Sequence, residues 1–144
     1  MINFLNDATG GHLLLWKVVL TSIVFALAGL QVAMAARFWG RPFLVALNPG
    51  TAVRVHRVSG RLALTLGVLV ALTCIVGPAG PLSPTRVALH SIFGILVFTV
   101  LAVKFLLIKV LRQGDSVLPL IGSLLFLAFG AIWATSVADY VAAK

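Results

Sequence analysis

The sequence predicts an all-α integral membrane protein, a single domain over residues 1–144 in which four helices form an up-down-up-down bundle. The first observation is composition, because 61% of the residues are hydrophobic and 10% are charged, with a mean hydropathy of +1.15. Soluble domains contain about 45–50% apolar and about 25% charged residues. The second is the presence of four long apolar segments, none of which alternates apolar and polar residues as a membrane β-strand does.

The four apolar segments each approach the roughly 20 residues that a helix needs to cross a bilayer. They cover residues 13–36, 55–76, 86–111 and 117–139. The first ends on VAMAA, as a signal peptide does, but its apolar core is too long and the leader MINFLNDATGGH has no basic charge. We therefore expect it to be a true span. The connections are short and rich in glycine and proline, which places consecutive spans antiparallel.

The basic residues gather on one side of this predicted topology. The net charge is +8, from 11 Lys and Arg against 3 acidic residues. Eight basic residues flank the first and third connections: Arg37, Arg41, Arg54, Arg57, Arg61, Lys104, Lys109 and Arg112. By the positive-inside rule these connections are cytoplasmic, so we expect a multi-pass protein of the plasma (inner) membrane with both termini outside, in the extracytoplasmic space. Attraction to anionic membrane lipid explains the charge without a nucleic-acid partner.

The sequence offers little for catalysis by the chain alone. It contains no motif of a hydrolase, a zinc site or a phosphate-binding loop. With 3 acidic residues, a carboxylate pair for general acid-base chemistry or for a hard metal ion is hardly available. Cys74 is the single cysteine, and we expect it to be a packing residue. We therefore do not expect the chain to be a catalyst by itself.

Histidine and glycine recur at the same spacing near the start of two spans, as His56 with Gly60 and His90 with Gly94. An ionisable side chain within a span usually has a partner or a ligand. Imidazole binds haem iron, and a glycine one turn away leaves room for the edge of a porphyrin. The alternative is close helix packing through small residues. On the second span the small residues form a stripe: Gly60, Ala63, Gly67, Ala71 and Cys74.

The two histidines are expected to mark two levels of the membrane. In antiparallel spans His56 lies near the cytoplasmic end and His90 near the outer end, about 20 Å apart in depth at about 1.5 Å per residue. Each level then needs its own second ligand. His12 is the candidate at the outer level if the first helix begins near residues 6–7, and Met34 is the candidate at the inner level. A five-coordinate haem, or a ligand from another subunit, is the alternative.

Polar side chains near both histidines suit the rim of a haem or of a quinone headgroup. Arg57 and Arg61 at the inner level, and Arg86 one turn before His90, are candidate partners for haem propionates. A polar cluster ends the fourth span: Trp133, Thr135, Ser136, Asp139 and Tyr140. This cluster is either an interfacial aromatic belt with a hydrogen-bonded cap or part of such a rim.

The motifs HRVSG at residues 56–60 and LHSIFG at residues 89–94 resemble the histidine-bearing helices of membrane-embedded b-type cytochromes of the cytochrome b561 class and of related ferric-reductase-like bundles. The resemblance covers residues 54–111 best. It implies helix pairs that bind two haems b, one near each face, and pass electrons across the membrane from a donor such as quinol or ascorbate. The chain departs from this pattern because its fourth span contains no histidine.

We therefore expect a small cytochrome b with one or two haems b, which carries electrons within or across the plasma membrane as a subunit of a redox complex. Its expected partners are membrane lipid and other redox subunits or further copies of itself, and a quinone is a second candidate ligand. Two alternatives stay open. One is a cofactor-free accessory subunit of a larger membrane complex, and the other is a subunit that binds a chlorophyll-type tetrapyrrole through the same histidines.

Overall fold

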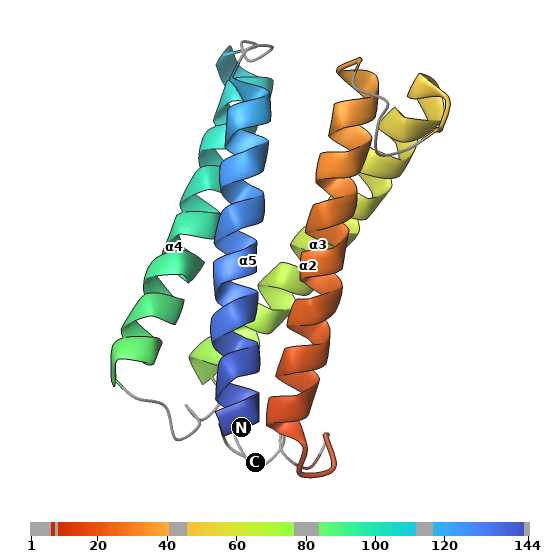
Figure 1. The fold of residues 1–144 in the computed structure, drawn as a ribbon. Helices are drawn as coiled ribbons and strands as arrows, with labels where there is room; N and C mark the ends of the chain where they lie inside the picture. The colour runs from red at the N-terminus through yellow and green to blue at the C-terminus, as the bar shows by residue number, and fades with distance from the viewer. Residues whose placement is uncertain (1–6, 8, 41–45, 77–83, 112–116, 143–144) are drawn as a thin grey trace.

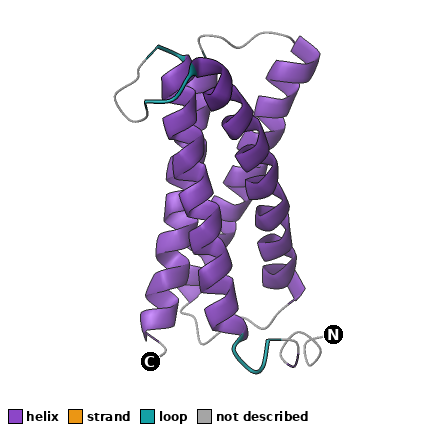
Figure 2. Ribbon diagram, turned by 90° about the vertical axis from the view of Figure 1, so that its right-hand side faces the viewer, coloured by secondary structure: helices purple, strands orange, loops and turns teal. Residues whose placement is uncertain are grey.

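The computed structural model of the chain consists of four long helices. It describes residues 7, 9–40, 46–76, 84–111 and 117–142, without the side chains of Phe38, Asp139 and Ala142. The helices are α2 (Leu13–Phe38), α3 (Pro49–Val76), α4 (Pro84–Leu106) and α5 (Leu118–Ala142), and a π-helical turn (Leu107–Leu111) extends α4. All four are long and apolar enough to span a membrane. No strand occurs among the described residues (Figure 2), so the all-α prediction is confirmed.

Three of the four helices lie close to their predicted bounds, and the second begins earlier than predicted. α3 starts at Pro49 instead of near residue 55. The side-chain oxygen of Asn48 accepts the backbone N–H of Gly50 at 2.9 Å, which caps the helix. Pro49 follows at the first helical position, where its missing N–H leaves no hydrogen bond unmade. The Asn-Pro pair therefore starts the helix, although the predicted span began only at residue 55.

Consecutive helices run in opposite directions, so α2 begins and α5 ends at the same end of the bundle (Figure 1). We call this end, at which α3 also ends and α4 begins, the N/C end. The opposite end, where α2 ends and α3 begins, is called the far end. α3 crosses α2 obliquely and does not run parallel to it (Figure 1).

The packing between helices is uneven. α2 packs against α3 and α5, and α4 packs against α5, but α3 and α4 share no comparable interface in the described part of the chain. In a closed bundle each helix would contact two neighbours along its length. The missing interface leaves room between α3 and α4.

A stack of aromatic rings joins α2 to α5. The ring of Phe25 lies between those of Phe126 and Trp133, with centroids 5.2 Å apart in both pairs. The indole N–H of Trp133 donates to the Ser22 hydroxyl at 2.9 Å. Stacked aromatic pairs add about 0.5–1.5 kcal/mol beyond the burial of their surface. These contacts fix α5 against the first half of α2.

The outer surface of the bundle is apolar. Large side chains point away from the neighbouring helices, for example Leu120, which is 71% exposed, and Leu127, which is 67% exposed. A soluble helix bundle would carry charged and polar residues on these faces. Exposure of such side chains along helices of this length suits contact with lipid chains.

Candidate ligand-binding cavity and the two histidines

The histidine near the far end belongs to a hydrogen-bonded network between α2 and α3. The His56 ring is half-buried, and its Nδ1 lies 3.1 Å from the backbone oxygen of Gln31. A carbonyl oxygen only accepts, so Nδ1 carries the hydrogen. In return the Gln31 amide donates to the backbone oxygen of His56 at 2.8 Å and to the Ser59 hydroxyl at 2.6 Å. The two helices are thus tied together by reciprocal bonds.

The glycine of this first motif is closed in by the same amide. A Cβ added at Gly60 would lie 2.9 Å from the side-chain oxygen of Gln31. The glycine therefore allows α2 and α3 to approach, as small residues do at membrane helix interfaces. At this level the space beside the histidine motif is filled by a side chain of the facing helix.

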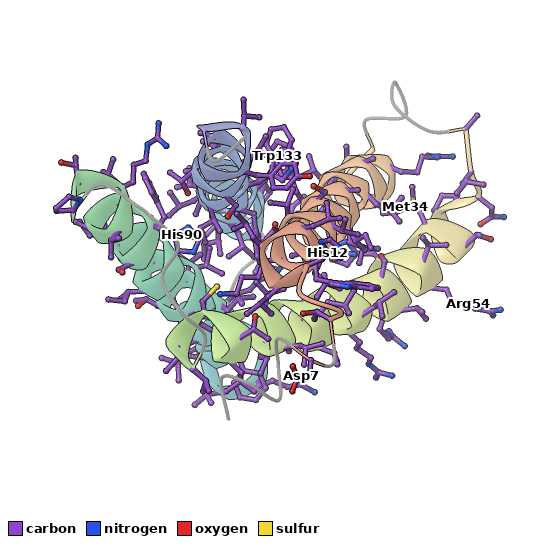
Figure 3. All side chains as sticks on the ribbon, turned by 90° about the horizontal axis from the view of Figure 1, so that it is seen from below. Asp7, His12, Met34, Arg54, His90 and Trp133 are labelled. Carbon is purple, nitrogen blue, oxygen red and sulfur yellow. The ribbon has the colours of Figure 1, made fainter. Side chains whose placement is uncertain are left out.

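The other residues predicted to lie around His56 differ in burial, because Met34 is buried and the arginines are exposed. Met34 lies on α2 one turn beyond Gln31 and is 2% exposed, the largest fully buried side chain among the described residues. Arg57 and Arg61 are exposed, and Arg54 extends away from the helices (Figure 3). A thioether buried in this way fills core space. Ligand roles for His56 and Met34 stay predictions.

The histidine near the N/C end is oriented by α5. The His90 Nδ1 lies 3.1 Å from the Thr135 hydroxyl oxygen. That hydroxyl has one hydrogen, which points to backbone oxygens of its own helix, those of Ala131 at 3.1 Å and Ile132 at 2.8 Å. When the hydroxyl hydrogen is on one of those oxygens, the hydroxyl accepts from the His90 Nδ1–H, and in that tautomer the lone pair is on Nε2. His90 lies on the side of α4 that faces α5 (Figure 3).

A cavity of about 730 Å³, which is partly open to the outer surface of the bundle, lies beside His90, in the half of the bundle next to the N/C end. This volume is within the about 300–1,000 Å³ of typical small-molecule and cofactor sites. All four helices contribute to its lining, which is mostly apolar. The lining residues most relevant to chemistry are Lys17, Thr21, Cys74, His90, Ser91, Trp133 and Ser136.

The glycines around the cavity border open space. A Cβ added at Gly94 or at Gly67 would meet no other atom within 4 Å, and both residues line the cavity. The small-residue stripe of α3 is thus divided between two uses. Its first part packs against Gln31 of α2, and its last part, from Ala63 to Cys74, lines the cavity.

The predicted outer-level partners of His90 lie outside the cavity lining. His12 is exposed, follows Gly10 and Gly11 with φ values of 60° and 81°, and precedes the first residue of α2, Leu13. α2 therefore starts later than residues 6–7, the start that the His12 and His90 pair required, and the pairing stays a prediction. Arg86 is half-buried one turn before His90 but is absent from the lining.

Some residues of both sites were missed or undervalued in the sequence. Gln31 was not singled out, although a lone amide in an apolar span commonly bonds to a facing helix. Lys17 was given no role and Cys74 was predicted to be a packing residue, whereas both line the cavity. Thr135 was noted in the polar cluster of the fourth span, without its bond to His90.

The fold and the cavity define a class of protein, a helical membrane protein with a ligand-sized apolar cavity among four spanning-length helices. Residues 5–144 match the family described as "Family of unknown function (DUF6529)". The chain belongs to this family. No curated protein and no solved structure matches the chain.

Proposed function

We propose that the protein is a membrane cytochrome that binds one haem b in the cavity beside His90 and carries electrons in the plasma membrane. The observation that supports this most strongly is the combination of an imidazole that lines the cavity and is held through Nδ1 by Thr135, a glycine that borders open space, and an apolar cavity of about 730 Å³. His90 would bind the iron, and Gly94 would leave room for the edge of the porphyrin.

The residues present fit this cofactor. Histidines that bind metals usually donate their other ring N–H to an oxygen, which fixes the ring and its tautomer, and Thr135 provides that oxygen for His90. The apolar lining suits a macrocycle, and Gly67 and Gly94 leave space in which its ring could lie. The haem would supply reversible one-electron chemistry, while the chain supplies an axial ligand and a medium of low dielectric constant.

Basic charge supports the proposed orientation of the chain. At the far end the described basic residues are Arg37, Arg54, Arg57, Arg61, Lys104 and Lys109, while Lys17 and Arg86 are the described ones at the N/C end. The far end would then face the cytoplasm and the cavity would lie in the outer half of the membrane. An electron donor or acceptor outside the cell, a quinone, or another redox subunit would meet the haem there.

A second candidate function is that of a cofactor-free accessory subunit of a larger complex. The network of Gln31, His56 and Ser59 favours it, because there a histidine of the same motif serves helix packing. In that case the cavity beside His90 would hold a lipid chain. A third candidate function is the binding of a chlorophyll-type tetrapyrrole through His90.

Visible absorption of the protein purified in mild detergent distinguishes these functions. A cytochrome b is expected to show bands that sharpen and shift on reduction with dithionite, at one haem per chain. A chlorophyll-type pigment would show strong red bands that do not respond to dithionite. If the protein shows no visible absorption, and if haem added to it does not bind in a saturable manner, the cytochrome proposal is wrong.

A further inference from the structure

A lysine reaches the cavity from α2. Lys17 is half-buried and lines the cavity together with His90. It lies four residues after the start of α2 at Leu13, and His90 lies six residues after the start of α4 at Pro84. At about 1.5 Å per residue these positions are about 6 Å and about 9 Å from the N/C end. Counted along its own helix, Lys17 is therefore slightly closer to the N/C end than His90.

The charge of Lys17 is not balanced within the cavity. No aspartate or glutamate occurs among the lining residues that the structure describes. Among the described residues, the Lys17 ammonium has no hydrogen-bond or ion-pair partner. An ammonium in a membrane span is costly unless it reaches water or finds an opposite charge. A ligand with an acidic group would provide that charge.

We infer that Lys17 binds a carboxylate of the cavity's ligand, which on the proposed function is a propionate of the haem. The ligand thus combines a large apolar body, which reaches His90, with an acidic group towards the N/C end. The sequence suggested Arg86 as the partner of a propionate, but Lys17 lines the cavity and Arg86 is not among its described lining residues. Charge-assisted bonds between an ammonium and a carboxylate are among the stronger polar contacts in proteins.

The test compares haem b with its dimethyl ester, in which both propionates are neutral. Each is titrated into the full-length protein, freed of haem, in nanodiscs of phosphatidylcholine, and dissociation constants are measured by absorbance. We expect the wild-type protein to bind haem b about tenfold or more tightly than the ester. Lys17→Met should remove most of this preference by weakening haem b alone, while Lys17→Arg keeps it. Arg86→Met, as the matched control, should also keep it.

Three outcomes would overturn the inference. Equal affinity of the wild type for haem b and its ester, with both lost in His90→Ala, leaves the cytochrome proposal intact and removes the role of Lys17. Loss of the preference in Arg86→Met and not in Lys17→Met transfers the carboxylate to Arg86. If neither tetrapyrrole binds, native mass spectrometry compares phosphatidylglycerol with phosphatidylcholine, and a preference for phosphatidylglycerol that Lys17→Met removes would assign Lys17 to a lipid phosphate instead.

Discussion

The two copies of the histidine-glycine motif differ in what the facing helix places beside them. Near the far end, a Cβ on Gly60 would lie 2.9 Å from the Gln31 side chain, whereas a Cβ on Gly94 would meet nothing within 4 Å. Both histidines are hydrogen-bonded through Nδ1 to an oxygen of a neighbouring helix, His56 to a backbone carbonyl and His90 to a hydroxyl. The same spacing in sequence therefore serves helix packing in one place and borders a cavity in the other.

The difference follows from the path of α3. This helix packs closely on α2, but it has no comparable interface with α4, and it crosses α2 obliquely (Figure 1). Small residues at a close helix crossing allow backbones to approach. Small residues on the part of α3 that faces α4 instead enlarge the space between them. The histidine-glycine spacing therefore identifies one face of a helix. The angle at which that helix crosses its neighbours determines whether the face packs against a helix or borders a cavity.

Substitution of Gly94 and of Gly60 by leucine should give the largest difference between the cavity and the packing interface of α2 and α3. Gly94→Leu would project into the cavity, so we expect haem affinity to fall at least about 100-fold with a change in stability within about 0.5 kcal/mol. Gly60→Leu would force α2 away from α3 and destabilise the fold by about 1–3 kcal/mol. Haem titration and reversible unfolding in detergent micelles measure the two effects. The comparison fails if Gly94→Leu binds haem normally, or if Gly60→Leu unfolds like the wild type.

Removal of the Thr135 hydroxyl should have an intermediate effect. In Thr135→Val the His90 Nδ1–H loses its acceptor while the shape of the side chain is kept, and loss of such a supporting bond typically weakens metal binding about 10–100-fold. We expect about tenfold weaker haem binding and a changed reduction potential, measured by absorbance titration and redox potentiometry. Thr21→Val, also at the cavity but bonded within α2, is the control. An unchanged potential in Thr135→Val would show that the bond does not orient an iron ligand.

Removal of the Gln31 amide should have the smallest effect. Gln31→Leu leaves the Ser59 hydroxyl and the His56 backbone oxygen without this donor, and polar contacts between membrane helices are worth about 0.6–2 kcal/mol. We expect a loss of stability of about 1 kcal/mol with haem affinity unchanged. Thr65→Val, whose exposed hydroxyl bonds within α3, should leave stability unchanged. If Gln31→Leu lowers haem content as well, the far-end level takes part in cofactor binding.

The helices themselves could be predicted because membrane insertion depends on the length and hydropathy of a segment, which are local properties. The start of α3 was the exception, since the cap by Asn48 and the position of Pro49 were not recognised as a helix start. The site could be predicted only in part. His90 and Gly94 were identified as a pair from their spacing, and the structure places both at the cavity.

What escaped prediction depends on contacts between helices. The sequence contains no direct record that Gln31 faces Gly60, or that Lys17 and Cys74 share a cavity with His90. These contacts follow from crossing angles and helix rotation, which helical periodicity alone does not determine. For the same reason the stripe of small residues on the second span was interpreted as one surface, although it has two environments.

The amount of haem in two histidine variants tests the central claim most directly. Wild-type protein, His90→Ala and His56→Ala are purified side by side, and haem per chain is measured by the pyridine haemochrome method, with circular dichroism and elution volume as checks on folding. We predict about one haem per chain in the wild type and in His56→Ala, and almost none in a folded His90→Ala. A His90→Ala protein that keeps the wild-type haem content would contradict the account, and a wild type with two haems that loses one in His56→Ala would show that both levels bind the cofactor.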